Sequence, residues 1–294
     1  MRLTGRRESS NVEDRRGLSG GTKAGIGGIG GVIIIAIITL LSGGDLSDVV
    51  SNVVQSKLQG QVTEETNNGQ AEFSPEEEEA ATFSKQVLGS LEDVWTEQFK
   101  EHGMTYTYPT IVLFTGTVQT ACCTGSAQMG PFYCSGDQKL YLDLSFFADM
   151  SRQFHININN KNSFAYAYVI AHEVGHHVEY LRGILSKAHS EMNQVNKEEA
   201  NKISVKLELL ADYYAGVWAH YENEKYKSLE DGDLKEAIDA ASKIGDDYLQ
   251  KEAQGYACPE TFTHGTSAQR MYWLKRGVET GDWNTTTFST EDGI

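Results

Sequence analysis

The chain has 294 residues, with 25 Lys and Arg against 41 Asp and Glu, and its net charge is −16. This excess of acidic groups argues against nucleic-acid partners, which bind to basic surfaces, and against tight docking of the folded domain on anionic lipid.

A membrane segment is the first predicted element. Six basic residues, the last of them Lys23, precede residues 24–42, which lack charged side chains and are nearly long enough to span a bilayer. The positive-inside rule then predicts a basic cytoplasmic segment at 1–23, a transmembrane anchor at 24–42 and an extracytoplasmic remainder. A cleavable signal peptide is the alternative, since Ser42 and Gly44 are small, but the segment before the apolar stretch is long for one.

A folded domain is predicted to begin after a polar linker at residues 45–73, which shows no hydrophobic periodicity. Ser74 is a suitable helix N-cap, Pro75 suits the first turn, and Glu77 completes a capping box. The helix that follows carries an apolar stripe typical of a core-facing helix: Phe83, Val87, Leu91, Val94, Trp95 and Phe99.

Two strands are predicted next, at residues 110–119 and 139–144, because both segments are short and rich in apolar and β-branched side chains. The loop between them contains Gly130 and Pro131, and helical patterns dominate after Phe164.

Four cysteines lie in the predicted extracytoplasmic part, where an oxidising compartment favours disulfides. Cys122, Cys123, Cys134 and Cys258 allow three complete pairings. One arrangement joins Cys122 to Cys134 and Cys123 to Cys258, which would leave no free thiol. A zinc–thiolate site is the rival interpretation, although the chain has no C-x-x-C motif.

Residues 172–176 read His-Glu-Val-Gly-His within an apolar run that predicts a helix. Residues four apart lie on one face of a helix, so His172 and His176 can bind one metal ion. The pattern H-E-x-x-H is that of zinc metallopeptidases, in which the glutamate, here Glu173, acts as general base on a water activated by zinc. The alternative is a surface helix with two solvated histidines, which the apolar flanks disfavour.

A third ligand is predicted further along the chain, in a helical pattern around residues 204–216. Glu208 and Asp212 are four residues apart in its apolar middle, and buried carboxylates are costly unless they meet cations or metals. We predict that Glu208 binds Zn²⁺ and that Asp212 accepts the N–H of His172. Pairing of both acids with Lys or Arg on a solvated face is the alternative.

His264 is the last candidate residue. It precedes a predicted helix whose N-cap is Thr266 or Ser267 and which extends to about Val278. A histidine at this position could stabilise the oxyanion of a tetrahedral intermediate, and the alternative is a structural histidine bonded to loop carbonyls.

The metal helix and the acidic pair that follows it resemble the gluzincin arrangement of thermolysin-like peptidases, with a longer spacer. The chain resembles more closely the bacterial putative neutral zinc metallopeptidase family, whose members are typically membrane-anchored. The resemblance covers most of the chain and is carried by residues 1–9, 129–134, 141–147, 172–176, the helix of Glu208, and 262–270. It implies a zinc peptidase-like domain with a peptide or protein substrate.

These observations predict an α+β fold: a zincin-like metallopeptidase domain at residues 74–280, helix-rich with a small sheet, preceded by a single transmembrane helix and followed by a tail at 281–294. In zinc peptidases of this type an edge strand near the metal helix commonly pairs with extended substrate, and we expect residues 127–142 to form that wall.

The predicted function is that of a membrane-anchored zinc-dependent peptidase with catalytic residues Glu173 and His264 and metal ligands His172, His176 and Glu208. The predicted location is the bacterial cell membrane, with the N-terminus cytoplasmic and the catalytic domain periplasmic. A non-proteolytic, zinc-bound envelope adaptor and an amidase acting on cell-wall amide bonds are the alternatives. Glu173 favours an enzyme, because a structural site needs no carboxylate at that position.

Overall fold

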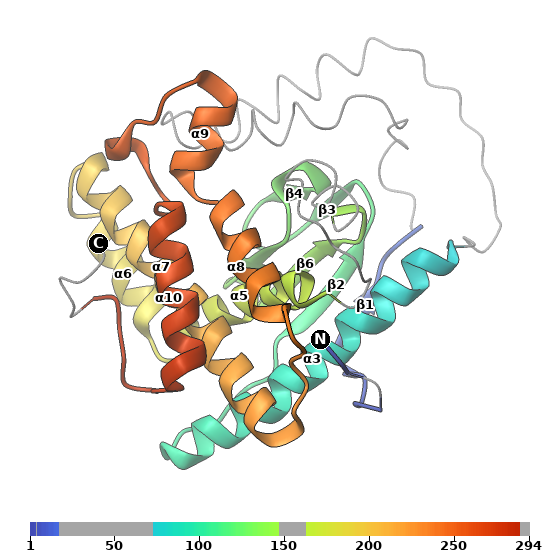
Figure 1. Cartoon of the computed structure of the whole chain (residues 1–294). Helices are drawn as coiled ribbons and strands as arrows, with labels where there is room; N and C mark the ends of the chain where they lie inside the picture. Colours follow the sequence, from blue (N-terminus) through green and yellow to red (C-terminus); the bar gives the residue numbers. More distant parts are fainter. Residues whose placement is uncertain (4, 18–72, 147–162, 289–294) are drawn as a thin grey trace, which may run out of the picture.

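The computed structural model describes residues 1–3, 5–17, 73–146 and 163–288 (Figure 1). The α-helices are α3 (Pro75–Glu101), α5 (Phe164–Leu181), α6 (Ile184–Met192), α7 (Lys197–Tyr226), α8 (Asp233–Lys243), α9 (Asp246–Gln254) and α10 (Ser267–Thr280). The strands are β1 (Val12–Asp14), β2 (Thr110–Phe114), β3 (Thr117–Gln119), β4 (Thr124–Ser126), β5 (Phe132–Cys134) and β6 (Lys139–Asp143). The described part is a helix-rich α+β fold with small sheets.

The larger sheet has the strand order β1-β2-β6-β5, in which β5 is antiparallel to β6 and the other neighbours are parallel. Successive side chains of a strand point to opposite faces. Ile111 and Leu113 of β2 accordingly join the main core with the helices, while Val112 and Phe114 pack with Val118 of the separate β3–β4 hairpin. One face of the sheet therefore supports the helices, and the hairpin covers the other.

The predicted start of the first long helix is confirmed. Ser74 caps α3, accepting a hydrogen bond from the Glu77 backbone while the Glu77 side chain accepts one from Ser74. The six residues of the predicted apolar stripe are all buried. The predicted strand at 110–119 is divided instead into β2 and β3, because Gly116 between them adopts a φ of 79° that bends the chain.

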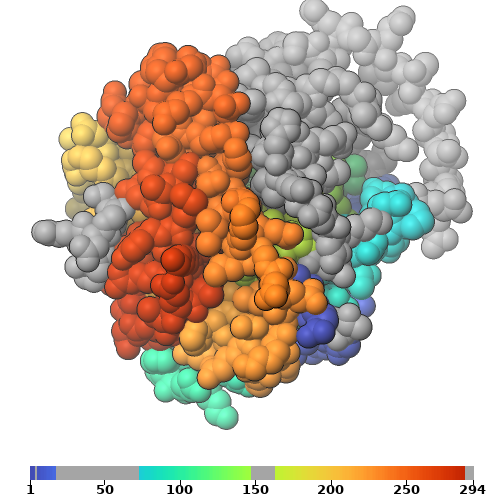
Figure 2. Space-filling model, viewed as in Figure 1, coloured from blue at the N-terminus to red at the C-terminus, as the bar shows by residue number. Residues whose placement is uncertain are grey.

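Helices α8, α9 and α10 contact one another and make up a continuous face of the molecule (Figure 2). Helix α7 lies between α10 and α5 and contacts both along much of its length. Of the predicted tail, residues 281–288 pack back on the domain, where the Trp283 ring stacks on His102 at 4.5 Å.

The metal-motif helix α5 and helix α7 approach closely at Gly175. A Cβ atom at this position would lie 2.8 Å from the carbonyl oxygen of Ala211 on α7, a distance that real Cβ contacts do not reach. Gly175 thus lets the backbones of α5 and α7 approach closely beside His176 and Asp212. The glycine of the H-E-V-G-H sequence is required for packing.

We expect Gly175→Ala to lower the free energy of unfolding by about 1–3 kcal/mol, because the added methyl group must push α5 away from α7. Urea unfolding of the metal-free protein, followed by circular dichroism, measures this loss. Ser186→Ala, at an exposed position of α6, is the control and should change stability little. Equal stability of Gly175→Ala and the wild type would show that the helices can separate at no cost.

Residues 1–3 and 5–17 are built into the domain. Strand β1 pairs in parallel with β2, with Val12 opposite Ile111. The guanidinium of Arg6 lies 3.2 Å from a carboxylate oxygen of both Asp93, on α3, and Glu222, on α7. The N-terminal segment therefore contributes a strand and partly buried ion pairs to the same body that contains the H-E-x-x-H helix.

The predicted localisation is wrong. It put residues 1–23 in the cytoplasm and the catalytic domain in the periplasm, on opposite sides of one membrane crossing. Since β1 belongs to the domain's own sheet, residues 1–17 and the domain lie on the same side of any membrane.

The predicted fold class is also wrong, because it included a single transmembrane helix before the domain. Among the helices of the described residues, none combines the length and the apolar character needed to cross a bilayer. The predicted anchor at 24–42 lies outside the described residues, as does the predicted linker up to residue 72.

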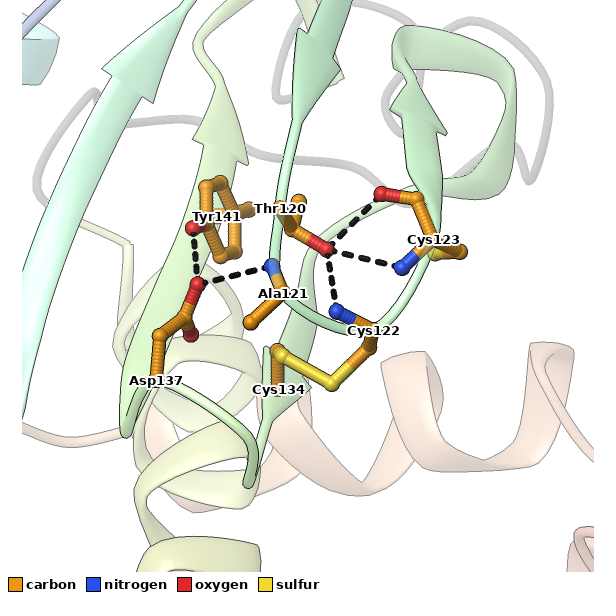
Figure 3. Close-up of a disulfide and its surroundings, with 7 residues drawn as sticks. All are labelled: Thr120, Ala121, Cys122, Cys123, Cys134, Asp137 and Tyr141. Carbon is orange, nitrogen blue, oxygen red and sulfur yellow. Dashed lines mark hydrogen bonds between the residues drawn. A yellow bond between two sulfur atoms is a disulfide. The ribbon is translucent and has the colours of Figure 1, made fainter.

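A disulfide joins Cys122 to Cys134, as in the arrangement considered above (Figure 3). It links the turn after β3 to strand β5. The Thr120 hydroxyl accepts hydrogen bonds from the backbone N–H groups of Cys122 and Cys123, which fixes the shape of this turn. The second predicted pair is wrong: Cys123 and Cys258 are free thiols.

Candidate active site

Three predicted metal ligands come together between helices α5 and α7. The Nε2 atom of His172 lies 3.2 Å from Oε2 of Glu208, and the Nε2 atom of His176 lies 3.5 Å from Oε1. One ligand atom from each residue falls within 4.8 Å of the others. Ligands held about 2.0–2.1 Å from a tetrahedral zinc ion lie roughly 3.3 Å apart, so these residues fit the ion with little adjustment.

Carboxylates orient both imidazoles. The Nδ1 atom of His172 lies 2.8 Å from Asp212 Oδ1, which is the contact that we predicted, and the Nδ1 atom of His176 lies 2.9 Å from Glu179 Oε2. A carboxylate only accepts hydrogen bonds, so each Nδ1 carries a proton, and each Nε2 would bind a metal once the proton that faces Glu208 is released. Sequence reasoning missed Glu179, although its position three residues after His176 places it within reach on the same helix.

Asp212 is in turn held by a buried network. The Nε atom of Arg270, from α10, lies 2.8 Å from Asp212 Oδ2, and the Tyr168 hydroxyl donates a hydrogen bond of 2.6 Å to Oδ1. Burial opposes the charged form, but the Arg270 guanidinium and His172 lower the pKa of Asp212 to about 2. The carboxylate is thus ionised and fixed in place, and Arg270 is a second residue that the sequence analysis did not identify.

His264 lies on the same cavity, in the loop before α10. Asp246 Oδ2 accepts hydrogen bonds from the backbone N–H groups of Thr263, His264 and Gly265, at 2.7, 2.7 and 3.1 Å. The His264 Nδ1 atom lies 3.1 Å from Asp246 Oδ1. This single buried carboxylate, which the sequence analysis also missed, therefore fixes both the loop and the imidazole.

Glu173 lies on the cavity between the two candidate ligands of α5 and is 9% exposed. Burial raises the pKa of its carboxyl. A carboxylate in this environment accepts a proton more readily than one in water, which suits a general base.

The cavity has a volume of about 350 Å³. Besides the residues already named, its walls are mainly apolar: Met129, Pro131, Phe132, Phe146, Val169 and Leu249. Phe132 and Tyr133 of strand β5 line this cavity and fall within the range 127–142, for which pairing with extended substrate stays a prediction. An apolar cleft with a few convergent polar groups is typical of a binding site for a small ligand or a peptide side chain.

Comparison with known proteins gives one family. A family model described as "putative neutral zinc metallopeptidase" matches residues 1–288. The chain is 43% identical over 290 residues to the uncharacterized protein YpfJ of Escherichia coli strain K12, covering 96% of each chain. It is 42% identical over 197 residues to the uncharacterized protein Rv2575 of Mycobacterium tuberculosis strain H37Rv, covering 64% of each. No solved structure matches the chain.

Proposed function

The chain belongs to the family described as "putative neutral zinc metallopeptidase", and on that premise we propose that it hydrolyses peptide bonds with His172, His176 and Glu208 as zinc ligands. One observation carries the proposal. Two imidazole Nε2 atoms and the Glu208 carboxylate converge on a cavity that Glu173 also lines. A structural metal site needs no second carboxylate beside its ligands.

In the proposed reaction zinc, when bound, supplies a Lewis acid that lowers the pKa of water and polarises a carbonyl oxygen. Glu173 takes a proton from the attacking water at its carboxylate and delivers it to the nitrogen of the leaving amine. Asp212 and Glu179 hold the two imidazoles in the metal-binding tautomer. Asp246 holds the Nδ1 side of His264, so the Nε2 atom is available to the substrate oxygen on which negative charge develops.

The cavity walls indicate the substrate class. Met129, Phe132, Val169 and Leu249 offer apolar surface beside the candidate ligands. A peptide that places an apolar side chain next to the bond to be cleaved would bury it there, at roughly 25 cal/mol for each Å² removed from water. We therefore propose that cleavage favours apolar residues adjacent to the scissile bond.

The test uses the purified full chain. Elemental analysis determines zinc per chain, and mass spectrometry follows cleavage of a mixed peptide library before and after removal of zinc with a chelator. Bound zinc, with cleavage that the chelator abolishes and added zinc restores, is expected. Zinc without cleavage of any peptide would favour the adaptor alternative, and release of amide-linked cell-wall fragments alone would favour the amidase. Absence of zinc at saturating concentration would overturn the metal site itself.

His264→Ala is expected to keep zinc but lower kcat by about 10²–10³-fold, because a donor to the developing oxyanion is removed. Steady-state kinetics on a peptide from the library, with zinc analysis of the same sample, measures this. His189→Ala, an exposed histidine of α6, is the matched control. A kcat equal to that of the wild type would leave His264 with only the structural role of closing its loop.

A further inference from the structure

Strand β5 borders the cavity and ends the described sheet. It pairs with β6 along one side, with Tyr133 opposite Leu140, and the strand order places no further strand of the described residues on its other side. Phe132 and Tyr133 both line the cavity. An edge in this position has backbone groups available for an extended peptide.

Besides the pairing of β5 with β6, each residue of β5 makes a side-chain contact. Cys134 is disulfide-bonded to Cys122 in the turn after β3, and the Phe132 ring stacks on Tyr141 at 5.0 Å, so both contacts lie on the face of the sheet that packs against the hairpin. Tyr133 points the other way. Its hydroxyl oxygen lies 2.9 Å from Nδ1 of His177, which belongs to the metal-motif helix α5.

The direction of this hydrogen bond follows from the contact that the second ring nitrogen of His177 makes. The Nε2 atom of His177 lies 2.6 Å from the carbonyl oxygen of Thr107, and a carbonyl can only accept. Nε2 therefore carries a proton, and the Nδ1 atom of the neutral ring accepts the hydrogen of Tyr133. His177 is fully buried, so no bulk water replaces a lost partner. These two hydrogen bonds, from Tyr133 to His177 and from His177 to Thr107, join β5, α5 and the segment that leads into β2.

We propose that Tyr133 is a positioning residue that, through His177, sets the distance between the substrate-pairing edge of β5 and the helix of the metal ligands. The inference rests on the proposed peptidase function. A peptide paired with β5 lies about 4.7–4.9 Å from that strand, so the place of β5 decides whether its carbonyl reaches the ligands on α5. A displacement of about 1 Å can cost roughly 10²-fold in rate.

Tyr133→Phe removes the hydroxyl and keeps the ring. The variant should keep its zinc, since the three candidate ligands are intact. For an octapeptide that can pair along β5, kcat/KM should fall by about 10–100-fold, mainly through kcat, because a misplaced carbonyl reacts slowly once bound. For a blocked dipeptide, which is too short to pair along the strand, we expect a change of less than about threefold, because its binding does not use the edge of β5.

Tyr141→Phe is the matched control. It removes a hydroxyl from the neighbouring strand β6, where that group donates to Asp137 rather than to α5 (Figure 3). A length-dependent loss in Tyr133→Phe and not in Tyr141→Phe supports the proposal. Equal losses on the octapeptide and the dipeptide, or no loss in Tyr133→Phe, would overturn it.

Hydrogen exchange of the β5 amides provides a readout that does not depend on catalysis. Tyr133→Phe should exchange faster than the wild type across residues 132–134, whereas Tyr141→Phe should retain more protection there. Unchanged exchange in Tyr133→Phe would overturn the positioning role. If the wild type cleaves neither peptide, the proposed peptidase function fails, while the exchange rates still decide whether the hydroxyl holds β5.

Discussion

Replacing Glu173 by glutamine is expected to lower peptide turnover by about 10²–10⁴-fold while bound zinc remains. Glutamine keeps the size of the side chain but cannot take a proton from water. Because Glu173 is not one of the three grouped ligands, His172, His176 and Glu208 still bind the metal. Single-turnover cleavage of a peptide from the library, with zinc analysis of the same preparation, measures both quantities.

The control for Glu173→Gln is Glu191→Gln, which removes a charge from the exposed part of α6. That control should cleave at the rate of the wild type. Turnover retained in Glu173→Gln would remove the general-base role and favour another proton acceptor on the cavity. Loss of zinc together with turnover would mean that Glu173 helps to hold the metal.

Glu208→Ala is expected to abolish stoichiometric zinc binding. The substitution removes the carboxylate that approaches both Nε2 atoms and comes from the other helix, so only the two imidazoles of α5 remain. Two ligands do not complete a zinc site, which takes at least three protein groups. Competition with a coloured chelator measures the affinity, and turnover should be lost in proportion to zinc.

Asp212→Asn tests the carboxylate that orients the imidazole of His172. The asparagine leaves the three ligands in place but weakens the hold on His172, and zinc affinity should fall by about 10–100-fold. It also leaves the buried Arg270 without its anionic partner, at a cost of about 3–5 kcal/mol in stability. Full zinc occupancy in Glu208→Ala would contradict the assignment of Glu208 as a ligand. If zinc affinity fell less in Glu208→Ala than in Asp212→Asn, Asp212 would be the ligand and Glu208 the supporting residue.

Local patterns predicted much of the candidate site. His172 and His176 lie on one face because they are four residues apart on a helix, and the same spacing places Glu208 and Asp212 together on α7. The capping box at Ser74 likewise marked the start of α3. Such relations depend on helix geometry within a few residues, so they can be read from one segment of sequence.

Longer-range relations could not be read in this way. Asp246 and Arg270 reach His264 and Asp212 only because α9 and α10 pack where they do. Glu179 is different: it lies only three residues after His176, so helix geometry alone could have predicted its contact. The pairing of β1 with β2 was hidden because an apolar stretch between them suggested a membrane crossing, and that interpretation separated two segments that share one sheet.

The N-terminal strand has a consequence for the order of events during synthesis. Residues 1–17 emerge from the ribosome before the segments that they contact, since β1 pairs with residues 111–113 and Arg6 pairs with Glu222 near the end of α7. Contacts between segments so far apart in sequence form late, because a long loop must close before they give any stabilisation. Strand β1 and Arg6 therefore remain unpaired until the later segments have been made, and a nascent chain stalled before residue 222 would have Arg6 without that partner.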